Sequence, residues 1–215
     1  MKKGLTELVL ILDRSGSMTG LESDTIGGYN AMLKKQQAVD GECRITTLLF
    51  DNTFELLHDR IDIQAVSEMT DKEYQVGGTT ALIDAIGMSL HKIDNAQKHT
   101  AEEYRAEKVI FVIITDGEEN SSREYSTAQV KDMINKRKKD NGWEFIFLGA
   151  NIDAVGTAGT FGIGADRAVD YIADSEGTSL NFAIMSKTVA NFREQGVIEE
   201  GAFNEIRDDV KRRGR

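Results

Sequence analysis

Two segments of this chain are unbroken runs of apolar residues, and each ends in acidic or hydroxyl residues. The first run covers residues 8–12 and the second covers residues 109–114. Continuous runs of this length are typical of strands buried on both faces of a parallel sheet. Ligands of open α/β sheets bind just beyond the carboxyl ends of such strands. We therefore expect the polar residues after each run to form a site.

The rest of the pattern alternates between strands and helices. We expect further strands at residues 44–50, 54–58, 143–148 and 168–172. Helices are expected at residues 24–38, 82–93, 126–139 and 180–192. The three-residue break between the strands at 44–50 and 54–58 predicts a hairpin and hence one antiparallel edge strand. The alternation predicts a Rossmann-like, doubly wound α/β fold, with a mainly parallel central sheet and helices on both faces.

Four residues that follow the two apolar runs could bind a metal ion, and all four would do so through side-chain oxygens. Asp13, Ser15 and Ser17 come after the first run, and Asp116 comes after the second. Right-handed crossovers would place the two acidic residues on adjacent central strands. Carboxylate and hydroxyl oxygens suit Mg²⁺, Ca²⁺ or Mn²⁺ better than zinc or copper. The sequence therefore predicts a divalent-cation site.

A glycine pair and two threonines between the runs complete a recognisable order. Asp13-x-Ser15-x-Ser17 is followed by Thr79 after Gly77-Gly78, and then by Asp116 after the later strand. This order resembles the metal-ion-dependent adhesion site (MIDAS) of von Willebrand factor type A (vWA) domains. The resemblance implies that Mg²⁺, with Mn²⁺ or Ca²⁺ as alternatives, is bound directly by both serines. It also implies that Thr79 binds directly or through water and that the acids often act through water.

The resemblance carries expectations about organisation as well. It covers residues 1–172 as the core of a single vWA domain that spans residues 1–215, and it leaves residues 173–215 as a C-terminal helix and tail. In some relatives a C-terminal helix moves to switch affinity, and the predicted helix at 180–192 is the matching hypothesis here. Residues 199–215 end in a basic stretch and are expected to fray or to form a basic tail.

The function that the resemblance implies is binding of a protein partner. In vWA domains an open coordination position on the metal accepts an acidic side chain from the partner. A stand-alone intracellular protein of the bacterial or phage type would act as an adaptor or assembly subunit, and such relatives often work beside AAA+ ATPases or kinase and phosphatase systems. The alternative is a Mg²⁺-dependent hydrolase, phosphatase-like, that uses the same carboxylates. It lacks a His or Lys near the serines in sequence, although folding could still supply a base.

Charge and composition narrow the class of partner and the compartment. The chain has 26 basic and 36 acidic residues and a net charge of −10, which disfavours nucleic acid and anionic membranes as partners. No apolar segment is long enough to span a membrane, and the N-terminus lacks the pattern of a signal peptide. The single cysteine, Cys43, cannot form an internal disulfide. We expect a cytoplasmic protein.

Several other polar residues have simpler interpretations. Glu118 and Glu119 are expected to be part of a solvated loop, and Asp51 to be a turn residue. Asp84 is expected either to orient waters near the metal or to lie at the surface. The histidines show no pair at metal-ligand spacing and are expected to be structural or exposed: His58, His91 and His99.

Overall fold

The protein is built around one six-stranded sheet. The computed structural model describes residues 1–214. The strands are β1 (Lys2–Asp13), β2 (Cys43–Phe50), β3 (Phe54–Asp62), β4 (Ala106–Thr115), β5 (Glu144–Ala150) and β6 (Ala168–Tyr171). Their order is β3-β2-β1-β4-β5-β6, and every neighbouring pair is parallel except β2 and β3. The predicted mainly parallel sheet with one antiparallel edge strand is confirmed.

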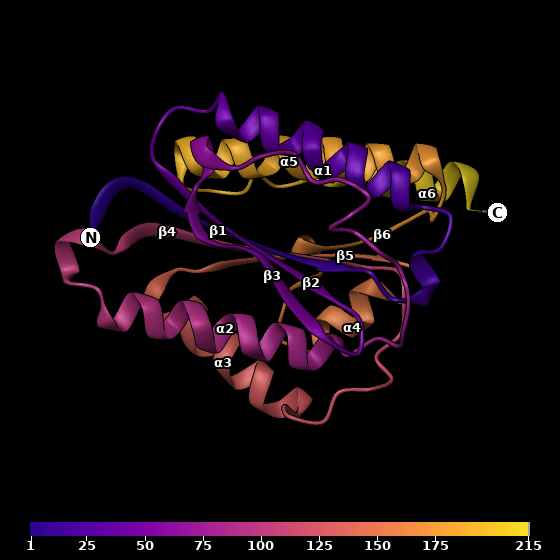
Figure 1. Cartoon of the computed structure of the whole chain (residues 1–215), viewed down its shortest axis with the longest axis horizontal. Helices are drawn as coiled ribbons and strands as arrows, with labels where there is room; N and C mark the ends of the chain where they lie inside the picture. The colour runs from indigo at the N-terminus through magenta and orange to yellow at the C-terminus, as the bar shows by residue number, and fades with distance from the viewer. Residues whose placement is uncertain (215) are drawn as a thin grey trace.

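Helices cover both faces of this sheet. They are α1 (Glu22–Gln37), α2 (Leu82–His99), α3 (Thr127–Asn141), α4 (Ala154–Thr160), α5 (Ser175–Gln195) and α6 (Asn204–Arg213). Figure 1 shows α1, α5 and α6 on one face and α2, α3 and α4 on the other. No helix among residues 1–214 combines the length and the apolar character needed to cross a membrane.

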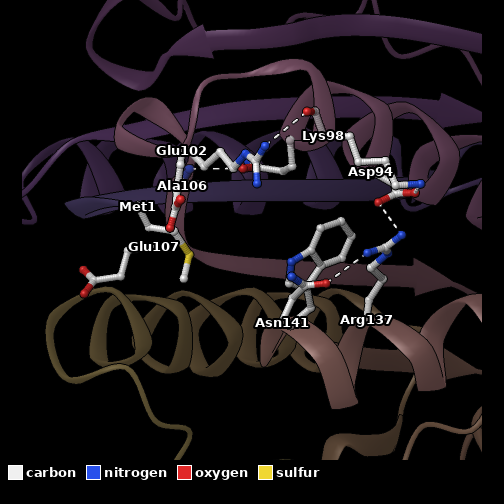
Figure 2. Close-up of a pocket in the computed structure, with 11 residues that line it drawn as sticks. Met1, Asp94, Lys98, Glu102, Ala106, Glu107, Arg137 and Asn141 are labelled. Atoms are coloured by element: carbon white, nitrogen blue, oxygen red, sulfur yellow. Dashed lines mark hydrogen bonds and ion pairs between the residues drawn. The ribbon is translucent and has the colours of Figure 1, made fainter.

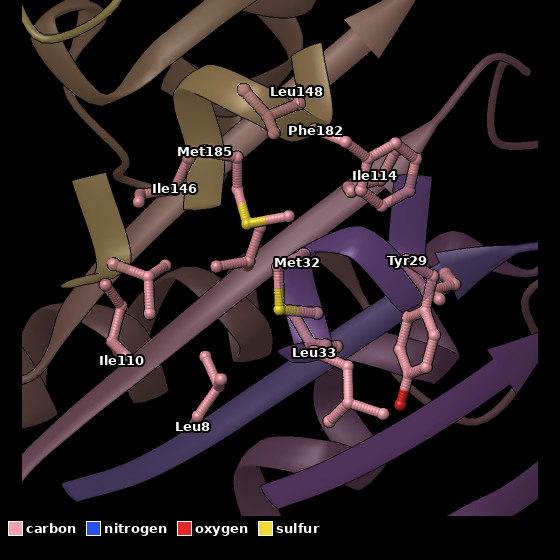
Figure 3. Packing of buried hydrophobic residues seen from close by; sticks show 14 of the residues in the cluster. Leu8, Tyr29, Met32, Leu33, Ile110, Ile114, Ile146, Leu148, Phe182 and Met185 are labelled. Carbon is pink, nitrogen blue, oxygen red and sulfur yellow. The ribbon is translucent and has the colours of Figure 1, made fainter. Parts of the chain in front are cut away.

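The two apolar runs predicted as strands are buried because each supplies side chains to both layers. Successive side chains of a strand point to opposite faces. Leu8, Leu10 and Leu12 of β1 therefore pack into the cluster under α1 and α5, whereas Val9 and Ile11 pack into the cluster under α2 and α3. Figure 3 shows the first cluster, in which side chains of β1, β4 and β5 meet those of α1 and α5.

The helix ends differ in part from the sequence-based boundaries. Helix α3 begins with a capping box, in which Ser126 accepts a hydrogen bond from the Gln129 N–H and the Gln129 side chain binds the Ser126 N–H. Helix α1 begins at Glu22, two residues before the predicted start at residue 24. Helix α5 extends well beyond the predicted 180–192.

The predicted fraying tail is wrong over residues 204–213, which form helix α6. Its Ile206 is 1% exposed, its Val210 is partly buried, and the preceding Phe203 is fully buried. The basic end is held by acids, because Arg213 pairs with Asp209 and with Asp174 at the start of α5. The mainly polar composition hid this helix from pattern analysis. Arg215, the last residue of the predicted tail, lies outside the described residues.

Candidate metal centre

Asp13 ends β1 at the carboxyl edge of the sheet and is held there by two hydrogen bonds. The Ser15 N–H donates to Asp13 Oδ1 at 2.7 Å, and the Thr115 hydroxyl of neighbouring β4 donates to Oδ2 at 2.5 Å. Asp13 is only 1% exposed, and this burial raises the pKa of its carboxyl while the hydrogen bonds oppose the rise. The carboxylate is thus fixed on the side that faces β4.

The two serines lie on a short turn that follows. Residues Gly16–Met18 form a 3₁₀ turn, and it brings the hydroxyl oxygens of Ser15 and Ser17 to 3.0 Å from each other. The Gly16 N–H donates to the carbonyl of Gly78 at 3.1 Å, and a β-carbon at residue 16 would lie 3.3 Å from that oxygen. Glycine at this position therefore permits the close approach of the loop that contains Gly78.

Asp116 follows β4 and has no hydrogen-bond partner for its side chain. Both of its carboxylate oxygens are buried and accept no hydrogen bond from residues 1–214. Burial raises the pKa of Asp116 to about 6, and the nearby charge of Asp13 contributes to the rise, while the hydroxyl of Ser17 opposes it. A buried carboxylate without donors is costly and calls for an explanation such as a bound cation or water.

Three hydroxyl groups converge around Gly117, the residue after Asp116. A β-carbon on residue 117 would lie 2.8 Å from the Thr80 hydroxyl oxygen, 2.9 Å from that of Ser17 and 3.6 Å from that of Ser15. The hydroxyls thus surround a place that only glycine leaves free. We call these three residues, together with Asp13 and Asp116, the oxygen cluster.

The threonine in this cluster is Thr80 and not the predicted Thr79. Thr80 is 3% exposed, and its backbone is fixed by Asn120, which accepts from the Thr80 N–H at 2.9 Å and donates its own N–H to the Thr80 carbonyl at 3.1 Å. Thr79 is exposed, and the threonine hydroxyl among the three atoms closest to a β-carbon at residue 117 is that of Thr80. Adjacent threonines point in different directions, so a one-residue offset decides which of them reaches the cluster.

The loop that carries Thr80 is tied to the end of β1. The Tyr74 hydroxyl donates to the Asp13 carbonyl at 2.5 Å, and the Gly77 N–H donates to the Arg14 carbonyl at 2.9 Å. Gly78 has a φ of +75°, and a β-carbon there would lie 2.1 Å from the Asn52 side-chain oxygen. The second glycine of the pair is therefore required both by its backbone conformation and by close contact.

The side chains of Asp84 and Glu119 both hold loop backbone through hydrogen bonds. Asp84 is 4% exposed and accepts hydrogen bonds from the N–H groups of residues 123–125, so the predicted surface position is wrong. Glu119 accepts from the N–H groups of Ile83, Ser121 and Ser122 and so holds the loop to the start of α2. It is not the solvated side chain that was expected. Pattern analysis missed both, because all backbone partners of Asp84 and one partner of Glu119, the Ile83 N–H, are distant in sequence.

The other predicted structural residues lie away from the oxygen cluster. Asp51 accepts hydrogen bonds from the N–H and hydroxyl of Thr53, as expected for a turn residue. His58 contacts the hydroxyls of Tyr29 and Thr47, and burial lowers its pKa. Among residues 1–214 no group of three or more His, Cys, Asp or Glu side chains is placed to hold a metal. The oxygen cluster instead combines two carboxylates with three hydroxyls.

A cavity lies at the amino end of the sheet, opposite the edge that carries the oxygen cluster. Figure 2 shows this cavity of about 140 Å³ beside Trp143. Its charged groups are already engaged. Arg137 pairs with Asp94 at 2.6 Å and stacks over the Trp143 ring, and Arg105 donates to the carbonyls of Lys98 and Thr100. These contacts give the region a structural role.

Known proteins match this chain in structure rather than in sequence. No family model matches it, and neither does any curated protein. A von Willebrand factor type A protein from Catenulispora acidiphila gives a TM-score of 0.58 at 14% identity, over 86% of this chain and 42% of that one. A mutant of the PilB minor pilin from Streptococcus sanguinis gives 0.59 at 10% identity, over 88% and 62%.

A third neighbour contains a metal. Proximal thread matrix protein 1 from the mussel byssus, in a structure with a zinc-occupied MIDAS motif, gives a TM-score of 0.58 at 12% identity, over 86% of this chain and 46% of that one. This chain thus spans about half the length of the Catenulispora chain and of the mussel chain. At these identities the likeness concerns the fold. The chain has the Rossmann-like α/β fold of von Willebrand factor type A domains.

Proposed function

We propose that this protein is a divalent-metal-dependent protein-binding module. The observation that carries the proposal is Asp116, whose two buried oxygens have no hydrogen-bond partner while three hydroxyls converge around the following residue, Gly117. Hard oxygen donors of this kind suit Mg²⁺, with Mn²⁺ or Ca²⁺ as substitutes. The zinc-occupied motif of the mussel protein supports a metal at this place in the fold.

The residues that would hold the ion are those of the oxygen cluster. Ser15, Ser17 and Thr80 supply neutral oxygens, and Asp13 and Asp116 supply the charge. Two carboxylates balance a divalent ion without leaving a surplus of negative charge, so the bound ion would attract a further carboxylate. A partner protein that presents an Asp or Glu side chain would then complete the site.

Binding is favoured over hydrolysis by the surroundings of the serines. A serine nucleophile needs an adjacent general base. The hydroxyls of Ser15 and Ser17 contact each other, no His or Lys among residues 1–214 is hydrogen-bonded to either of them, and His58 is bonded to Tyr29 and Thr47. The intracellular adaptor role and partners such as AAA+ ATPases or kinase and phosphatase systems belong to this proposal through the vWA resemblance.

Calorimetric titration with Mg²⁺ and Mn²⁺ tests the proposal, using the wild type and Asp116→Asn. Asparagine keeps the size of the side chain but removes the buried charge, so the fold should be retained. Asp13 is less suitable, because its carboxylate also binds Ser15 and Thr115. Saturable binding that the variant weakens at least tenfold is expected. Equal affinity in both proteins, or no binding to the wild type, would refute a metal centre here.

A further inference from the structure

A groove of about 530 Å³ lies beside the oxygen cluster. The two share one loop, because Thr80 points its hydroxyl toward the serines while its neighbours Thr79 and Ala81 line the groove. The opposite wall comes from the segment after β4. The groove is lined by Asn52, Phe54, Gly78, Thr79, Ala81, Asp84, Ser121, Arg123 and Glu124.

Arg123 is the only cation in this lining, and its charge is not used within the protein. Its backbone is fixed, since its N–H donates to Asp84 Oδ2 at 2.7 Å. Its side chain is exposed and forms no ion pair with any of residues 1–214. Most other arginines of the chain bind acids or carbonyls, as Arg14 binds Asp51. A fixed backbone with an unpaired guanidinium favours recognition of an external carboxylate.

A second unpaired group lies in the same wall. The hydroxyl oxygen of Ser121 is buried and has no hydrogen-bond partner among residues 1–214. Buried polar groups are normally bonded, so an orphan that lines a groove points to a ligand. The negative charge of Asp84 is taken up by three backbone N–H groups. The other acid in the lining, Glu124, is exposed and accepts no such bonds. Its negative charge would repel a carboxylate bound at Arg123.

We propose that the partner is recognised through two acidic side chains, one at the metal and a second at Arg123. This inference rests on the proposed function, because the first acid requires the metal. The partner segment would lie along the groove, with the second acid on the guanidinium and a polar group on the Ser121 hydroxyl. Because one fixed loop separates the two contacts, the spacing between the two acids would be fixed as well.

Selection from a random peptide display library in the presence of Mg²⁺ tests this inference. The proteins are the wild type, Arg123→Glu, Glu124→Gln and Lys139→Glu. Lys139→Glu is the matched control for charge reversal, because Lys139 is exposed and lies in the last turn of α3, at the end of the helix away from Arg123. The wild type should enrich peptides with one invariant acid and a second acid at constant spacing. Arg123→Glu should keep the first acid and replace the second with Lys or Arg.

The remaining outcomes separate this inference from the proposed function. Glu124→Gln should strengthen the preference for the second acid, and Lys139→Glu should leave it unchanged. Arg123→Ala should weaken a selected peptide by about two- to fivefold, the size expected for an exposed ion pair. Enrichment of a single acid, identical in wild type and Arg123→Glu, would overturn the inference and leave the metal-dependent module standing. Absence of any Mg²⁺-dependent enrichment would overturn both.

Discussion

The Thr115 hydroxyl on β4 donates a 2.5 Å hydrogen bond to the Asp13 carboxylate on β1, and so links the two central strands at the edge where the oxygen cluster forms. Thr115 is fully buried. The second carboxylate of the cluster, Asp116, has no comparable donor. One acid is thus fixed by protein donors, and the other has none.

Replacing this donor should destabilise the metal-free protein. Thr115→Val keeps the shape of the side chain but leaves Asp13 Oδ2 buried without a donor. We expect a loss of about 1–3 kcal/mol in the free energy of unfolding. Urea denaturation in the presence of EDTA measures it, with Thr115→Ser as the control that keeps the hydroxyl. Equal stability of Thr115→Val and wild type would show that the hydrogen bond contributes nothing.

The two adjacent threonines give a matched pair of variants. Thr80→Ala removes a hydroxyl from the oxygen cluster, whereas Thr79→Ala removes one from the exposed groove. We expect Thr80→Ala to weaken Mg²⁺ binding by about tenfold, the equivalent of roughly 1.4 kcal/mol. Thr79→Ala should leave Mg²⁺ affinity unchanged in the same calorimetric titration. The reverse pattern would restore Thr79 as the ligand and contradict the arrangement described here.

The affinity for metal should depend on pH through Asp116. Its pKa is raised to about 6, so below pH 6 the metal-free protein holds a proton there that a cation would have to displace. Mg²⁺ affinity should fall by about tenfold for each pH unit below 6 and should level off above pH 7. Titrations between pH 5 and pH 7.5 measure this, and Asp116→Asn should abolish the dependence on this group. A flat profile in the wild type would contradict it.

The same pKa shift has a consequence for stability without metal. In the unfolded chain Asp116 ionises near 3.8, whereas in the folded protein it ionises near 6. Between these values the folded state binds more protons, so this group's contribution to stability falls as pH rises from about 4 to 6. The difference in unfolding free energy between Asp116→Asn and wild type, measured in EDTA, should therefore increase over this range. A constant difference would argue against a raised pKa.

The sequence was most informative where burial dictates residue type. Strands β1 and β4 could be predicted because both of their faces are covered, which demands continuous apolar runs, and the polar residues after them mark the edge of the sheet. The structure brings Asp13, Ser15, Ser17 and Asp116 near one another, and it places Thr80 there in place of Thr79, since nothing in the pattern distinguishes the two threonines. The roles of Asp84 and Glu119 could not be predicted, because they depend on loop backbone that only the folded chain brings near.

A buried ion pair outside the site makes a further prediction about stability. Glu7 on β1 is fully buried and accepts hydrogen bonds from Arg60 on the edge strand β3 and from Gln97 on α2. Removing the arginine alone would leave a buried charge without its cation. We expect Arg60→Met to cost about 3–5 kcal/mol of unfolding free energy. The double variant with Glu7→Gln should recover much of this loss in urea denaturation, and strictly additive losses would contradict the coupling.

Helix α5 contributes too much of the core to be removed as a simple test of an affinity switch. Phe182, Met185 and Val189 belong to the cluster between α1, α5 and the sheet, and the Phe182 ring lies so close to Gly28 that a β-carbon there would be 2.4 Å from it. The buried Arg193 also donates to carbonyls at the end of α1. A chain that ends after residue 173 should therefore unfold, and its loss of metal binding would say nothing about switching.

Single substitutions at this contact separate packing from switching. Gly28→Ala forces the Phe182 ring to move and should cost about 1–3 kcal/mol of unfolding free energy. Phe182→Ala should cost about 3–5 kcal/mol, because it opens a cavity in the core. In Gly28→Ala the Mg²⁺ affinity, measured by calorimetry well below the unfolding temperature, should equal that of the wild type if α5 only supports the fold. A change in affinity without a change in fold would instead show that the position of α5 is coupled to the oxygen cluster.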